Sequence, residues 1–132
     1  MTGSGQNRIV VDWDGTCVDI KWPEMGDWKP HAIYALRTFL KLGFEVVIHS
    51  TRFSKMDVDE VTPYELHEAT VAQVRRMLDD VGLQEVEIWL RPWKPGGIVY
   101  IDDKAIEFTT WPNVMERLTL GGKLSAQTEL LR

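Results

Sequence analysis

The chain has 132 residues, a length that fits one domain with a hydrophobic core of its own. Hydrophobic residues make up 44% and charged residues 27%, which is typical of a globular protein and argues against a disordered one. The formal net charge of -5 argues against broad, non-specific nucleic-acid binding, which needs a basic face. A nucleotide or a nucleic-acid end stays open as a ligand, because local charge can differ from net charge.

The cysteine content and the hydropathy of the chain indicate its expected cellular location. Cys17 is the only cysteine, so no disulfide can form within the chain. No apolar run reaches the roughly 20 residues of a membrane-spanning helix, and the N-terminus lacks the pattern of a signal peptide. We therefore expect a protein of the reducing cytoplasm that has no membrane partner.

The first half of the chain alternates between strand and helix patterns. The short β-branched run at 9–11 predicts a strand that is buried on both faces. Apolar residues at helical spacing over 31–42 predict a helix, with Gly43 as its stop. A second buried strand is predicted over 46–48, followed by a polar and acidic loop over 53–63.

The second half continues this alternation. Pro63 suits the first turn of a helix that runs to about Val81, and alternating residues over 86–90 predict a third strand. A fourth strand is predicted over 98–101, and a short edge strand over 105–111.

The ends of the chain complete the predicted organisation. A last helix is expected over 112–120, while residues 1–7 and about 121–132 are expected to be loose tails. Strands that alternate with helices indicate βαβ units. We therefore predict one α/β domain over 1–132, a three-layer α/β/α sandwich with a mostly parallel, Rossmann-like sheet.

Polar residues follow three of the four core strands, at 12–14, 50–52 and 102–103. Ligands of parallel sheets bind at the carboxyl ends of the strands. The predicted topology therefore brings these three segments to one edge of the sheet.

The residue types in these segments suit phosphoryl chemistry. Of the pair Asp12 and Asp14, one carboxylate can attack phosphorus, and the other can protonate the leaving oxygen and then activate water. Asp102 and Asp103 are ligands of the kind that Mg²⁺ prefers. The Ser50 hydroxyl is a candidate hydrogen-bond donor to a phosphoryl oxygen.

Three further residues are candidates for binding the substrate phosphate. Lys94, in a loop before the fourth strand, offers an ammonium that can neutralise phosphate charge and hold Asp12 ionised. Thr51 and Arg52 directly follow Ser50, and Arg52 has a surface ion pair as its alternative.

Four segments together resemble the motifs of the haloacid dehalogenase-like (HAD) phosphohydrolase superfamily. Residues 12–16 look like its first motif, the strand that ends at Ser50 like its second, Lys94 like its third, and residues 101–103 like its fourth. They occur in the family's order, and the resemblance covers roughly residues 8–111.

The resemblance implies a HAD-like fold and a magnesium-dependent phosphatase with an aspartyl-phosphate intermediate on Asp12. It implies that Asp14 is the general acid and base. In the family the metal is held by the first aspartate, by the backbone carbonyl of the second and by the fourth-motif acid, here Asp12, Asp14 and Asp102. Asp103 is a further metal ligand, through a water molecule, or a support for Lys94.

The short segments between the motifs leave no room for the large specificity cap of many family members. A capless site implies a large substrate or a cap supplied by another subunit, so a homo-oligomer stays open. A small phosphorylated molecule and a macromolecular phosphomonoester are both open as substrates. Two other functions also remain: a phosphotransferase with the same intermediate, and a non-catalytic module that binds a phosphoryl ligand or a protein.

Overall fold

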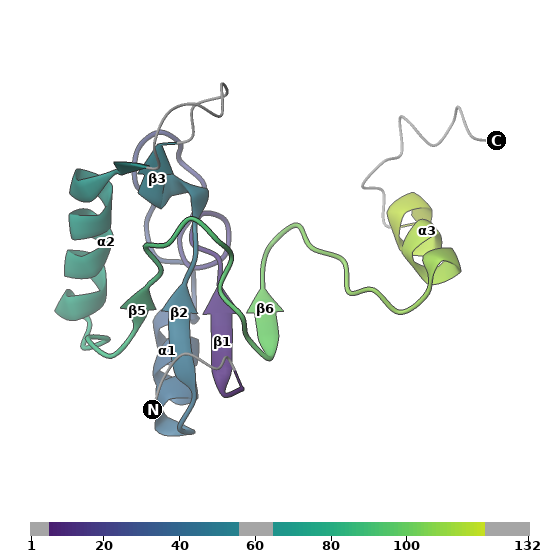
Figure 1. Cartoon of the computed structure of the whole chain (residues 1–132), viewed down its shortest axis with the longest axis horizontal. Coiled ribbons are helices and arrows are strands. Elements are labelled where there is room, and N and C mark those ends of the chain that lie inside the picture. The colour runs from purple at the N-terminus through teal and green to yellow at the C-terminus, as the bar shows by residue number, and fades with distance from the viewer. Residues whose placement is uncertain (1–5, 56–64, 121–132) are drawn as a thin grey trace.

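The computed structural model describes residues 6–55 and 65–120. Its main sheet has four parallel strands in the order β5-β2-β1-β6 (Figure 1). These strands are β1 (Arg8–Val11), β2 (Glu45–Ile48), β5 (Glu87–Ile88) and β6 (Val99–Ile101). A separate antiparallel pair consists of β3 (Ser54–Lys55) and β4 (Glu65–Leu66).

The helices of the described chain are α1 (Ala32–Lys41), α2 (Glu68–Asp80) and α3 (Trp111–Leu120), with a short 3₁₀ turn, η1 (Thr51–Phe53). Both α1 and α2 end before a glycine at positive φ, Gly43 and Gly82, which is the usual stop of a helix. No described helix combines the length and the apolar character needed to cross a membrane.

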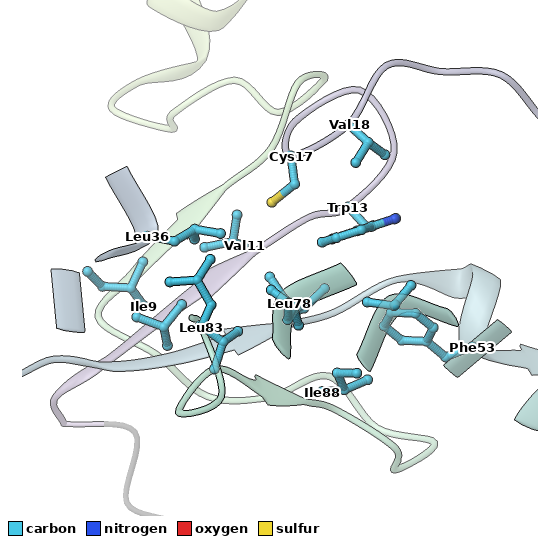
Figure 2. Packing of buried hydrophobic residues seen from close by; sticks show 14 residues of the cluster. Ile9, Val11, Trp13, Cys17, Val18, Leu36, Phe53, Leu78, Leu83 and Ile88 are labelled. Carbon is cyan, nitrogen blue, oxygen red and sulfur yellow. The ribbon is translucent and has the colours of Figure 1, made fainter. Parts of the chain in front are cut away.

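Helices α1 and α2 cover the same face of the sheet. The register pairs Ile9 with Val46 and Val11 with Ile48, so these four side chains point to one face. They form one buried cluster with residues of both helices (Figure 2). The buried helical members of that cluster are Leu36, Val74 and Leu78.

The opposite face is covered by the connection between β5 and β6. The steps from β1 to β2 and on to β5 run in one direction, whereas the step to β6 runs back across the sheet (Figure 1). Because connections between parallel strands are right-handed, the β5–β6 connection must pass over the face opposite α1 and α2. There it approaches so closely that a Cβ at Gly97 would lie 2.8 Å from Cγ2 of Val10 and 2.9 Å from the carbonyl oxygen of Arg8.

The predicted α/β class and its parallel, Rossmann-like sheet are confirmed, with the four core strands where the sequence placed them. On the face opposite α1 and α2, the described layer is an extended connection and not the second helical layer of the predicted sandwich. The predicted helix at 112–120 is confirmed as α3, which lies away from the sheet (Figure 1).

One predicted strand is absent, and one helix begins later than predicted. The expected edge strand at 105–111 is wrong, because the Asp102 side chain accepts the backbone N–H of Lys104 at 2.7 Å and the chain turns away from the sheet. Helix α2 begins at Glu68, after β4, and the expected start at Pro63 lies outside the described residues.

The remaining expectations concern segments that lie partly or wholly outside the described residues. The expected loop at 53–63 begins with the end of η1 and with β3, while its residues from 56 onward are not described. The expected tails lie outside the described residues at 1–5 and 121–132.

Substituting Gly97 tests the close approach of the β5–β6 connection to the sheet. We expect Gly97→Ala to lower the free energy of unfolding by about 1–3 kcal/mol, because the added methyl must push apart two packed segments. Gly96→Ala is the matched control, since a Cβ there meets nothing within 4 Å. Equal urea-unfolding midpoints for the two variants would contradict this packing.

Candidate active site

Asp12 lies at the point where the strand order reverses. It directly follows β1, and its backbone N–H donates to the carbonyl oxygen of Ile101 at the end of β6, at 2.9 Å. The connections leave β1 toward β2, while β6 returns on its other side. In open parallel sheets this reversal forms the usual ligand-binding crevice.

Three carboxylates meet at this point. Asp12, Asp102 and Asp103 each offer an oxygen atom, and these atoms lie within 4.8 Å of one another. The pKa of Asp12 is raised from its ordinary value of 3.8 to about 6. Burial is the largest cause, a backbone hydrogen bond from Trp13 acts against it, and repulsion from Asp102, Asp103 and Asp14 contributes to the rise.

The turn after Asp12 brings the third acid close. Gly15 has a φ of 86°, and a side chain at this position would collide with the Asp103 carboxylate. The same turn places the Thr16 hydroxyl as a donor to Oδ2 of Asp12, at 3.4 Å. A glycine is therefore required both for the backbone conformation and for the approach of Asp103.

The acid cluster fits a hard divalent cation. Its donors are carboxylate oxygens, which Mg²⁺ and Ca²⁺ prefer, and a bound cation would relieve the repulsion among the three acids. Asp103 also lies 3.3 Å from the ammonium of Lys104, so the structure pairs it with Lys104 and not with Lys94.

Lys94 lines the same cavity as Asp12. This cavity has a volume of about 210 Å³ and is lined by Val10, Asp12, His49, Lys94, Tyr100, Ile101, Asp102 and Ala105. The Lys94 ammonium lies 4.3 Å from the centroid of the Tyr100 ring, a cation–π contact. The structure therefore brings together Asp12, Asp102 and Lys94 from three separate segments.

Asp14 faces a different environment. Its two carboxylate oxygens accept hydrogen bonds from Arg52, at 2.9 Å from Nε and 2.8 Å from Nη2. Arg52 also donates to the carbonyl oxygens of Pro23 and Glu24, and its guanidinium lies 4.5 Å from the Trp22 ring centroid. Arg52 therefore links Asp14 to the loop at 22–24.

The ion pair given above as the alternative for Arg52 is present, but it is buried and not on the surface. Arg52 is 6% exposed, and three of its nitrogen atoms have protein acceptors. The carbonyl groups of the loop at 22–24 contribute to this burial. Binding of the substrate phosphate by Arg52 stays a prediction. Asp14 is not among the described residues that line the Asp12 cavity.

Ser50 and Thr51 line a second cavity next to the first. Ser50 also caps η1, because its Oγ accepts the backbone N–H of Arg52 at 3.1 Å. A hydroxyl that accepts one hydrogen bond can still donate its own hydrogen. His49 and Lys94 line both cavities and so join them.

His49, which lines both cavities, was not singled out in the sequence analysis. The register pairs Val11 with Ile48, so His49 follows β2 as Asp12 follows β1. Both therefore point to the face opposite the helices. The sequence did contain a signal for this position, because aligning the two predicted buried strands places His49 beside Asp12. Burial, and then the nearby Lys94, lower the pKa of His49.

Cys17 is a packing residue. It is buried in the core cluster, and burial, with Asp12 nearby, raises the pKa of its thiol to about 12. Thiolate chemistry at neutral pH is therefore disfavoured.

Comparison with known proteins adds information about the fold alone. No protein-family model and no curated protein sequence matches this chain. A solved structure of a conserved protein from Bacteroides thetaiotaomicron is similar, with a TM-score of 0.55 and 18% sequence identity. The match covers 86% of this chain and 90% of that one. At this identity the similarity supports the α/β fold and says nothing of activity.

The Asp14–Arg52 pair can be tested by removing its buried partner. We expect Arg52→Ala to lower the free energy of unfolding by about 3 kcal/mol, because it leaves a partly buried carboxylate and two carbonyl groups without their donor. Lys29→Ala is the control, since the Lys29–Asp19 pair is exposed and should contribute less than about 1 kcal/mol. Similar losses in chemical denaturation would contradict a structural role for Arg52.

The raised pKa of Asp12 predicts a pH-dependent penalty in the absence of divalent cations. Ionised Asp12 disfavours the folded state, so the penalty begins as the pH rises through 3.8 and is complete above about 6. With EDTA present, Asp12→Asn should be more stable than the wild type at about pH 8, by roughly 1 kcal/mol after allowance for solvent screening.

This difference should shrink as the pH falls toward about 3, where the wild-type carboxyl is protonated in both states. Thermal unfolding across that pH range measures it. A variant that is less stable than the wild type at high pH, or a difference that does not change with pH, would contradict the assignment.

Proposed function

We propose that this protein is a magnesium-dependent phosphatase that hydrolyses a phosphomonoester through an aspartyl-phosphate on Asp12. One observation carries this proposal: Asp12, Asp102 and Asp103 converge at the β1–β6 switch point, with Lys94 lining the same cavity. A carboxylate nucleophile needs this combination, because positive charge must offset its repulsion from an anionic phosphate. The motif resemblance supports the same reading.

In the first step an oxygen of Asp12 attacks phosphorus, and the bond between phosphorus and the leaving oxygen breaks. Asp14 gives its proton to that oxygen, and an alcohol leaves. In the second step Asp14 takes a proton from water, whose oxygen attacks phosphorus and releases phosphate with the Asp12 carboxylate. Both oxygens of Asp14 accept hydrogen bonds from Arg52. Acid catalysis therefore requires one of these contacts to break and Asp14 to take up a proton from solvent before the first step.

The remaining residues have roles that follow from their positions. Lys94 and Ser50 hold phosphoryl oxygens, and Thr16 orients the Asp12 carboxylate through its hydroxyl. The side chains of Asp12 and Asp102, with Asp103 nearby and the Asp14 carbonyl, would hold Mg²⁺. When bound, the cation supplies charge neutralisation for the attack of one anion on another.

The decisive experiment compares phosphate release by the wild type and by Asp12→Asn, over a panel of phosphomonoesters with and without Mg²⁺. We expect Mg²⁺-dependent release that falls at least 10³-fold, on the order of the loss of a nucleophile, in the variant. Asp19→Asn serves as the surface control and should keep its activity. Undiminished release by Asp12→Asn would exclude the mechanism.

Two alternatives have distinct outcomes. A phosphotransferase would respond to added alcohols with more leaving-group release but no more inorganic phosphate. A non-catalytic module would release nothing, and a beryllofluoride adduct on Asp12 would then separate an enzyme with an untested substrate from a binder.

A further inference from the structure

A second hollow adjoins the Asp12 cavity, and the proposed mechanism uses only part of it. It has a volume of about 210 Å³ and is lined by His49, Ser50, Thr51, Ser54, Trp89, Arg91, Pro92 and Lys94. It shares His49 and Lys94 with the Asp12 cavity. A group bonded to a phosphate in the Asp12 cavity therefore has the second hollow within reach.

The charge of this hollow differs from that of its neighbour. Among the described residues, its lining holds two cationic side chains, Arg91 and Lys94, and three hydroxyl groups, without a carboxylate. The Asp12 cavity, in contrast, contains two carboxylates, Asp12 and Asp102. In a chain with a net charge of -5, a lining of cations and hydroxyl donors favours an anionic ligand.

Aromatic rings hold the Arg91 side chain in place. Its guanidinium carbon lies 5.7 Å from the Trp89 ring centroid and 5.6 Å from that of Trp93. Trp89 is itself fixed, because its indole N–H donates to the carbonyl oxygen of Trp93. These ring contacts leave the planar N–H groups of a guanidinium able to bind a carboxylate or a phosphate in a bidentate manner.

We propose that this hollow is a subsite for a second oxyanion on the leaving group. The substrate class is then a small phosphomonoester that also carries a carboxylate or a second phosphate. The inference rests on the proposed function, because it takes the transferred phosphoryl group to lie beside Asp12. The volume supports a small group, since sites for drug-sized ligands usually measure about 300–1,000 Å³.

Calorimetric binding to the full chain with Mg²⁺ tests the subsite without turnover. Phosphonoacetate and ethylphosphonate both resist hydrolysis, and only the former has a carboxylate. We expect phosphonoacetate to bind roughly tenfold more tightly or better, as a charge-assisted hydrogen-bond pair allows. Arg91→Gln should remove this preference and leave ethylphosphonate binding within about twofold. A bisphosphonate with a two-carbon spacer, run beside them, distinguishes a second phosphate from a carboxylate.

Arg76→Gln is the control, because Arg76 is exposed on α2 and lines neither cavity. Equal binding of all three compounds by the wild type would overturn the subsite and leave the phosphatase proposal standing. A preference that survives Arg91→Gln in a folded variant would also overturn it. Failure of every compound to bind overturns the subsite as well, and the phosphate-release assay then decides whether the proposed function falls with it.

Discussion

The burial of β1 between two parallel neighbours is the constraint on which the rest of the structure depends. Its four residues are all buried, which requires a covering layer on each face of the sheet. Pairing with β2 and β6 fixes where Asp12 lies relative to His49 and Asp102. The packing of the sheet therefore brings the acid cluster together. The stability of the surrounding core offsets the repulsion among its carboxylates.

A second constraint links the first motif to the loop after β2. Arg52 is buried and binds Asp14 together with two backbone carbonyl groups of the segment that follows. A guanidinium suits this position because its fork of donors can satisfy several acceptors at once. The same contacts fix the position of the Asp14 carboxylate. Fold stability and the position of the proposed general acid thus depend on one side chain.

Much of this arrangement could be predicted from the sequence, because it follows from short-range patterns. Buried β-branched runs identified β1 and β2, and polar residues after the strands identified the edge where Asp12 and Asp102 meet. The partner of Arg52 could not be predicted, since it depends on how an irregular loop folds. The chain after β6 was mispredicted for a related reason: an apolar stretch reads as a strand whether or not the sheet continues.

The two cavities divide opposite charges across a short distance, and this division suits phosphoryl transfer. Carboxylates for a cation gather on one side, while Arg91 and hydroxyl groups gather on the other. Lys94 and a His49 whose pKa burial lowers lie between them. Lys94 is the cation that the described lining of the acid cavity contains, and its ammonium lies 4.3 Å from the centroid of the Tyr100 ring. The carboxylates are therefore placed for a metal cation, while Arg91 and the hydroxyl groups are placed for an anionic group of the substrate.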